Sequence, residues 1–125
     1  MDRIKDNPKL DLNLRTKNLG INIYKLLNNL KYSYSSKIIF EQLLRSGFSV
    51  GANYSEATEC ESRLDFIHKI SVSKKEIKEV LYWLDILRGC AFKLNDSLFN
   101  TVKKEANELL LIFSKIVKTS KLNAK

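Results

Sequence analysis

Helix-breaking residues are almost absent from this chain after its first few positions. The 125 residues include one proline, Pro8, and four glycines. A proline inside a helix removes a backbone hydrogen bond and clashes with the preceding turn, so Pro8 bars only the start of the chain from a long helix. A β fold of this size would need many turns, which draw heavily on Gly and Pro. The sequence therefore favours an all-α fold.

Four segments repeat apolar residues at intervals of three and four, the spacing of one helix face. The predicted helices run from Leu14 to Leu30, from the end of a 31–36 connection to about Glu59, from Ser62 to Gly89, and from Asn95 or Asp96 to about Thr119. Their number, and the short polar links between them, predict an antiparallel up-down-up-down four-helix bundle in one domain. We expect a flexible arm over 1–12, the bundle over 13–121 and a short tail over 122–125. The predicted core positions are Leu19, Ile23, Leu26, Leu27 and Leu30; Ile39, Leu43, Gly47 or Phe48, Val50, Tyr54 and Ala57; Phe66, Ile70, Ser73, Ile77, Val80 or Leu81, Leu84 and Leu87; and Leu98, Val102, Leu109, Phe113 and Ile116.

The second predicted helix carries small residues through its middle, including Gly47 and Gly51. Each glycine in a helix interior costs about 1 kcal/mol relative to alanine, so a packing gain should offset it. The two glycines are four residues apart and therefore share one face, where another helix can approach closely. That partner is either a helix of the same chain or a helix of a second subunit.

Polar residues are interleaved with the same helix. Arg45, Asn53 and Glu56 fall within one broad sector, and Arg45 lies about 16 Å from Glu56 along a helix, too far for a direct pair. We expect Arg45 to pair with Glu76 or Glu79 of the third helix, because an unpaired buried charge is very costly. These polar residues either fix the register of the helices or contact a partner. Tyr82 and Trp83 form an aromatic pair suited to packing or, alternatively, to stacking on nucleic-acid bases.

The positive charge is concentrated at both ends of the chain. The formal net charge is +8, and residues 1–32 and 93–125 each hold seven basic and three acidic residues, for +4 apiece. Residues 33–62 carry −2 and residues 63–92 carry +2. If the terminal helices lie side by side they form a basic face, typical of proteins that bind nucleic acid or an acidic protein, although a solvated lysine surface gives the same pattern. The candidate phosphate contacts are Lys25, Lys31, Lys103, Lys104, Lys115 and Lys118.

Residue patterns typical of catalysis or metal binding are missing from the sequence. Cys60 and Cys90 are far apart, and His68 is the one histidine, so neither a zinc site nor a Glu-x-x-His di-iron site can be assembled. The glycines lack the following Lys-Ser/Thr of a phosphate-binding loop. We therefore expect a protein that is not an enzyme and holds no cofactor or metal. Without an apolar run of about 20 residues or a signal sequence, a cytoplasmic protein is expected.

Several motifs in the second, third and fourth helices resemble one family. The run Gln42-Leu43-Leu44-Arg45-Ser46-Gly47, continued by Ser49 to Asn53 and by Glu56-Ala57, resembles the signature of the "four helix bundle" family encoded in intervening sequences of bacterial large-subunit ribosomal RNA genes. Residues 65–69, Lys75-Glu76, Glu79 and 82–84 resemble its third helix and residues 116–119 the end of its fourth, so the resemblance covers about residues 19–121. Phe48 and Tyr54 depart from it, standing where smaller or aliphatic residues are expected, and the amino-terminal arm has no counterpart.

The resemblance implies an antiparallel bundle assembled into a ring, a homopentamer, as in the related accessory protein of diversity-generating retroelements. That relative works with a reverse transcriptase and binds nucleic acid through a basic surface. By this resemblance the chain is expected to be a non-enzymatic oligomeric protein that binds nucleic acid, RNA in the first place, or an RNA-associated scaffold. The alternative is a scaffold that engages an acidic or RNA-processing protein and binds no nucleic acid itself.

Overall fold

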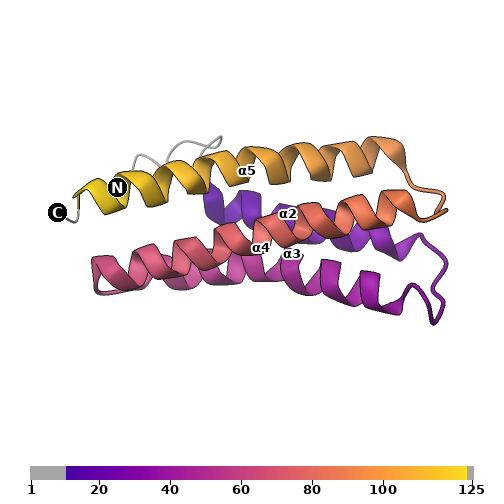
Figure 1. Ribbon diagram of the computed structural model, residues 1–125, viewed down its shortest axis with the longest axis horizontal. Coiled ribbons are helices and arrows are strands. Elements are labelled where there is room, and N and C mark those ends of the chain that lie inside the picture. Colours follow the sequence, from indigo (N-terminus) through magenta and orange to yellow (C-terminus); the bar gives the residue numbers. More distant parts are fainter. Residues whose placement is uncertain (1–10, 124–125) are drawn as a thin grey trace.

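The chain folds as an antiparallel four-helix bundle, which confirms the predicted fold class (Figure 1). A computed structural model describes residues 11–123. The helices are α2 (Leu12–Asn28), α3 (Lys37–Thr58), α4 (Arg63–Gly89) and α5 (Asp96–Asn123), and no strand occurs between residues 11 and 123. Each helix runs opposite to the one before it, as short connections between helices require.

Side-chain caps account for where three of the helices begin. Asp11 accepts a hydrogen bond from the Leu14 amide at 3.1 Å, Ser62 one from the Asp65 amide at 3.1 Å, and Asn95 one from the Leu98 amide at 3.0 Å. Such caps satisfy amides that have no partner inside the helix. The predicted cap at Ser62 is confirmed, and Asn95 rather than Asp96 caps α5.

Three predicted helix boundaries shift, one of which is the end of α2, at Asn28 rather than Leu30. Because Asp11 supplies a cap, α2 begins at Leu12, two residues earlier than predicted, and Leu12 is buried rather than part of an arm. The last helix, α5, continues to Asn123, beyond the predicted end near Thr119. The rest of the predicted arm, 1–10, and of the tail, 124–125, lies outside the described residues.

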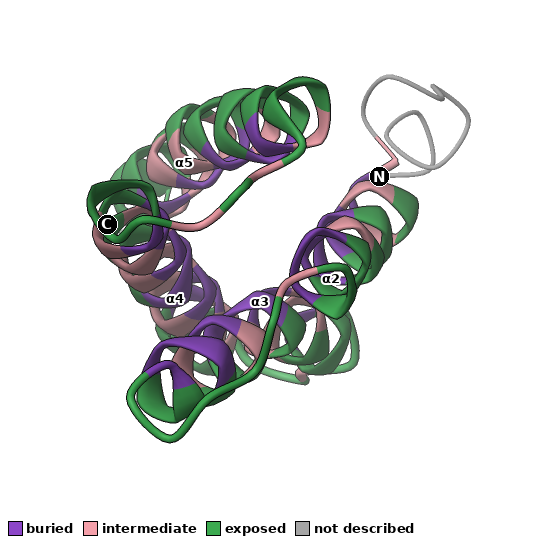
Figure 2. Ribbon diagram, turned by 90° about the vertical axis from the view of Figure 1, so that its right-hand side faces the viewer, coloured by how far each residue is buried: buried purple, intermediate pink, exposed green. Residues whose placement is uncertain are grey.

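Buried side chains form one core on the inward faces of the four helices (Figure 2). Most predicted core positions are buried, whereas five of them are half-buried at the edge of the core: Leu30, Tyr54, Phe66, Leu98 and Ile116. Of the two options in α3, Gly47 is buried and Phe48 is 51% exposed. None of the helices in the described range is long and apolar enough to span a membrane.

Glycines let α2 and α3 approach each other closely. A Cβ added at Gly47 would lie 2.6 Å from Cδ1 of Ile23, and one added at Gly51 would lie 3.0 Å from Oγ1 of Thr16. In the opposite direction, a Cβ on Gly20 of α2 would lie 2.9 Å from the ring of Phe48. The space left by the missing side chains of α3 is thus filled by α2 of the same chain, which is the first of the two packing alternatives.

Neighbouring helices of the bundle differ in how extensively they contact each other. Of the four pairs of neighbouring helices, α3 and α4 pack most extensively and α2 and α5 least, and Figure 2 shows α2 and α5 set apart at the near end. Part of the reason is that α2, with 17 residues, is shorter than α5, with 28, and can contact only part of its length. Arg15 of α2 bridges the two helices, with its Nε 2.9 Å from Oε2 of Glu105.

The close contact between α2 and α3 predicts opposite effects for two alanine substitutions. Gly47→Ala should destabilise the fold by about 1 kcal/mol, because overpacking against Ile23 at about 1–3 kcal/mol outweighs a helix-propensity gain of about 1 kcal/mol. Gly89→Ala, where an added Cβ meets nothing within 4 Å, should be neutral or stabilising by up to about 1 kcal/mol. Urea unfolding monitored by circular dichroism measures both.

A double-mutant cycle attributes the effect to one atom. Ile23→Val removes the Cδ1 atom that the new Cβ would meet, so Gly47→Ala should cost less in the Ile23→Val background than in the wild type. Equal costs in the two backgrounds would contradict the proposed clash.

Candidate nucleic-acid interface

Arg45 connects α3 to α4 through two carboxylates. Its Nη1 lies 2.8 Å from Oε2 of Glu76 and its Nη2 lies 2.9 Å from Oε1 of Glu79. Gln42 of α3 accepts a further hydrogen bond from Nε at 3.2 Å, which orients the guanidinium. The arginine therefore contacts both of the partners that the sequence suggested as alternatives.

Burial makes the ionised form of Glu76 costly. Glu76 is 7% exposed, and this burial, together with the nearby Glu79 carboxyl, raises its pKa above the ordinary value even though Arg45 acts in the opposite direction. Burial lowers the pKa of Arg45, but its contacts with Glu76 and Glu79 outweigh burial and raise it. The guanidinium thus offsets the cost of a buried carboxylate, a role in positioning the two helices.

The other polar residues of the predicted network are separate from Arg45. Asn53 donates to the Ser49 carbonyl of its own helix at 2.9 Å, and Glu56 accepts from Lys69 of α4 at 3.0 Å. A further link was missed from the sequence: Ser73 of α4, fully buried, donates to the Val50 carbonyl of α3 at 2.9 Å. Its polar side chain at a core position was the available signal. Three separate polar links therefore tie α3 to α4.

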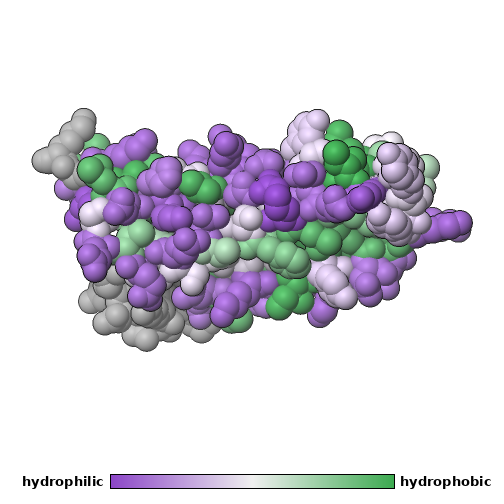
Figure 3. Space-filling view, turned by 90° about the horizontal axis from the view of Figure 1, so that it is seen from below, coloured by the Kyte–Doolittle hydropathy of each residue, from purple (hydrophilic) through white to green (hydrophobic). Residues whose placement is uncertain are grey.

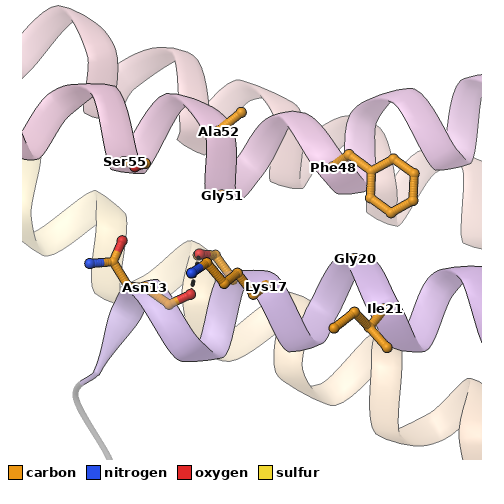
Figure 4. Close-up of a pocket in the computed structure, with 9 residues that line it drawn as sticks. Asn13, Lys17, Gly20, Ile21, Phe48, Gly51, Ala52 and Ser55 are labelled. Atoms are coloured by element: carbon orange, nitrogen blue, oxygen red, sulfur yellow. Dashed lines mark hydrogen bonds between the residues drawn. The ribbon is translucent and has the colours of Figure 1, made fainter.

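A shallow groove of about 360 Å³ lies between α2 and α3 (Figure 4). Gly20 and Gly51 form its floor, Phe48 and Ile21 stand at one end, and its remaining lining residues are Asn13, Thr16, Lys17, Ala52 and Ser55. Lys17 is the one ionisable residue among them. The groove is apolar and open, which suits contact with another apolar surface better than acid–base chemistry.

Exposed apolar side chains also form a band on one face of the bundle. Figure 3, which views the bundle from below Figure 1, shows this band running between hydrophilic side chains. The exposed apolar residues of α3 are Ile38 and Phe48. The predicted aromatic pair is split: Tyr82 is exposed, whereas Trp83 packs against the core, and the two rings meet edge to face at 5.1 Å.

Within residues 11–123, no cluster of three or more His, Cys, Asp or Glu side chains is arranged to hold a metal ion. The thiols of Cys60 and Cys90 are not joined in a disulfide, and His68 is exposed on α4. These residues are distributed over different parts of the bundle and form no common site.

The six predicted phosphate contacts are exposed but do not form a single cluster. Lys25 lies on α2, Lys31 follows α2 in the connection to α3, and the other four lie on α5. Lys103 lies 3.5 Å from Asp85 and therefore points toward α4. Lys104, Lys115 and Lys118 have no acidic partner within 4 Å in the described part of the chain. These three lie along the outer surface of α5, with Lys115 on the side toward α2.

Removing the Arg45 guanidinium should destabilise the fold. Arg45→Ala leaves Glu76 buried without its cation, which should cost roughly 2 kcal/mol, a value reduced from that of a fully buried pair because Arg45 is 46% exposed at its side chain. Glu79→Gln is the matched control and should cost only about 0.5 kcal/mol, since Glu79 is 35% exposed. Urea unfolding measures both free energies.

The same variant should change the pH dependence of stability. A raised folded-state pKa means that the contribution of Glu76 is fully present below its ordinary value of 4.5 and is lost as the pH rises through the folded pKa. Arg45→Ala raises that pKa further, so its cost should be larger at neutral pH than at about pH 4. A cost that is independent of pH would show that the two residues are not electrostatically linked.

Comparisons with known proteins agree with the geometry. The model of the 23S rRNA-intervening sequence protein family matches residues 9–115. A crystal structure of a protein of unknown function from the S23 ribosomal protein family of Bacteroides thetaiotaomicron is similar, with a TM-score of 0.72 and 29% identity over 86% of this chain and 95% of that chain. No curated protein matches the chain. Because the family match spans most of the bundle, the chain belongs to the 23S rRNA-intervening sequence protein family.

Proposed function

We propose that this protein is a non-enzymatic, oligomeric scaffold that associates with RNA by binding its phosphates through a basic surface. The observation that carries the proposal is the set of exposed lysines on α5 with no acidic partner in the described range, which includes the predicted contacts Lys104, Lys115 and Lys118 as well as Lys121. The family description refers to an intervening sequence of 23S rRNA, and the similar structure is described as a member of a ribosomal protein family. Both descriptions support ribosomal RNA as the class of partner.

Unpaired lysines favour phosphate binding for an energetic reason. A lysine that already pairs with a carboxylate must lose that contact before it can bind a phosphate, whereas an unpaired one loses only water. Phosphate contacts release counterions from the nucleic acid, and this release provides most of the free energy of non-specific binding. Lys104 and Lys118 are 14 residues apart, or about 21 Å along the helix, so they would contact different phosphates of one strand.

Self-association would use a different part of the surface. The groove between α2 and α3 and the neighbouring exposed Phe48 and Ile21 form an apolar area that an isolated bundle leaves in contact with water. Covering it with a second copy would remove that contact. The homopentamer and the kinship with the retroelement accessory protein, both expected from the resemblance, stay predictions.

The same apolar area is what favours the alternative function. A scaffold for an RNA-processing protein would use Phe48 and Ile21 as contacts and would need no affinity for nucleic acid. Direct RNA binding that is lost after removal of the lysines separates the two functions, because a scaffold of this kind would bind no RNA even with its lysines in place.

Nucleic-acid binding is tested with a labelled RNA hairpin and the purified full chain. Fluorescence anisotropy should show binding at low salt that weakens steeply as salt is added, with a slope of about −0.9 for each phosphate neutralised. The variant Lys104→Gln, Lys115→Gln, Lys118→Gln should bind more weakly and with a shallower slope. If the wild-type protein does not bind the hairpin at low salt, the proposed function is wrong.

The oligomeric state is tested by light scattering on purified protein. A pentamer of 14.5 kDa subunits has five times that mass, and Phe48→Ser should reduce the mass toward that of a single chain without unfolding the bundle. Tyr34→Ser, which removes an aromatic ring that is 93% exposed and lies outside the groove, is the matched control. A wild-type protein that is monomeric at high concentration would contradict the assembly.

A further inference from the structure

We infer that nucleic acid lies along the outer seam between α4 and α5, and that lysines of α4 absent from the predicted set contribute to the contact. We define the α4–α5 seam by its charged members, which are Lys74, Lys78, Asp85 and Arg88 of α4 and Asp96, Lys103, Lys118 and Lys121 of α5. The two helices run side by side in both views of the bundle (Figures 1 and 2). The inference rests on the proposed function and specifies where on the protein it takes place.

Two ion pairs identify the side of α4 that faces α5. Asp85 lies 3.5 Å from Lys103, and Arg88 lies 2.9 Å from Asp96. Lys78 and Lys74 precede Asp85 by seven and eleven residues, close to two and three helical turns, so they lie on the same side of α4.

The acidic residues in the middle of α4 lie on its other side. Glu76 and Glu79 face α3, where Arg45 contacts both of them. Lys74 is half-buried and Lys78 is exposed, and neither has an acidic partner within 4 Å among residues 11–123. In this middle part of α4 the two carboxylates therefore lie toward α3, whereas the ammonium groups of Lys74 and Lys78 lie toward α5.

The same reasoning identifies the side of α5 that faces α4. Lys121 follows Lys103 by 18 residues, five complete turns, and Lys118 lies slightly further outward on the same flank. Asn107, one turn after Lys103, adds a neutral amide donor. The acidic residues Glu105 and Glu108 face the opposite way, toward Arg15 of α2.

The seam therefore holds five lysines, Arg88 and two carboxylates, Asp85 and Asp96, which both lie at one end and pair with Lys103 and Arg88. Because the helices are antiparallel, Lys74 lies level with residue 114, beyond Lys103 and before Lys118. The charges are thus distributed along the seam rather than gathered at one point. From Lys103 to Lys121 the distance is about 27 Å, which corresponds to about eight phosphates of one strand at 3.4 Å each.

The surface on the other flank of α5, between α2 and α5, is less suited to binding phosphate. Glu105 and Glu108 lie there, and Arg15 is already engaged with both. Lys115 follows Glu108 by seven residues, close to two helical turns, so a phosphate approaching Lys115 would be repelled by these carboxylates, which reduces the gain from that lysine. The basic surface expected from the two terminal helices is thus interrupted on the side where those helices meet.

The α4–α5 seam recognises a charged backbone rather than a base sequence. Lysine is a flexible point charge, and contacts to phosphate position a nucleic acid without reading its bases. The stem of the half-buried Lys74 can pack between the helices while its ammonium group reaches solvent. RNA and DNA hairpins of equal stem length should therefore bind with similar affinity and similar salt dependence.

The test compares three double variants of the full chain, each losing two positive charges. Lys74→Gln with Lys78→Gln removes the α4 side of the seam, and Lys25→Gln with Lys115→Gln removes the α2–α5 side. The control is Lys37→Gln with Lys69→Gln, on α3 and on the side of α4 that faces α3. Anisotropy with a labelled RNA hairpin is measured over a salt series. The first variant should weaken binding by roughly tenfold for each lost contact near 0.1 M salt and lower the salt slope by about 2, while the control should change little.

Further readouts separate charge from folding. Lys74→Arg with Lys78→Arg keeps both charges and should retain most of the affinity, and thermal melting should show that all variants are folded. Wild-type binding that is unaffected by the first variant, or reduced equally by all three, would overturn the α4–α5 seam and leave the proposed function standing. Competition by polyglutamate as effective as that by RNA would also overturn it, because the surface would then suit an acidic protein. No binding by the wild type would refute the proposed function itself.

Discussion

The distance between α2 and α3 is the constraint on which the rest of the structure depends. Gly47 and Gly51 leave room for Ile23 and Thr16, so the two helices pack with little between them, and Phe48 is turned outward over Gly20. Thr16 is held in place because its hydroxyl donates to the Leu12 carbonyl at 2.7 Å. With one side of α3 occupied in this way, its other side carries Arg45, Glu56 and the Val50 carbonyl to α4. The glycine face and the polar face of α3 together determine where both neighbouring helices lie.

Much of this fold could be predicted from the spacing of apolar residues, because a 3.6-residue period shows directly which face of a helix is buried. The pairing of Arg45 with Glu76 and Glu79 could also be inferred, since a charge near the core needs a partner. The partner of the glycine face could not: the same four-residue spacing suits a helix of the same chain or of another. The sequence also could not show which of the adjacent residues Gly47 and Phe48 is buried, because the helical period alone does not distinguish neighbouring positions. The role of Ser73 needs the three-dimensional position of the Val50 carbonyl.

The net charge of a sequence segment does not show where on the protein a basic surface lies. Residues 63–92 carry a net charge of only +2 because the count subtracts Glu76 and Glu79 from lysines that lie on another side of the same helix. Conversely, the terminal segment that holds α5 carries +4, yet Glu105 and Glu108 are gathered on the side toward α2. A nucleic acid is affected by the charges within about a Debye length, roughly 8–10 Å at moderate salt, and not by the sum over a segment. Helical phase therefore matters more than net charge in locating a basic surface.

The apolar and basic surfaces lie on different pairs of helices, and this separation has a consequence for affinity. The α2–α3 groove and the α4–α5 seam occupy opposite sides of the bundle in Figure 2. Copies that associate through the apolar side would keep their lysine seams in contact with solvent, so one nucleic acid could be held by several seams at once. Each seam alone offers a few screened contacts, but linked sites bind with an effective concentration that raises the total affinity far above that of one site. The small charge of a single bundle is then sufficient, because assembly multiplies it, and a bundle that cannot assemble would bind weakly even with every lysine in place.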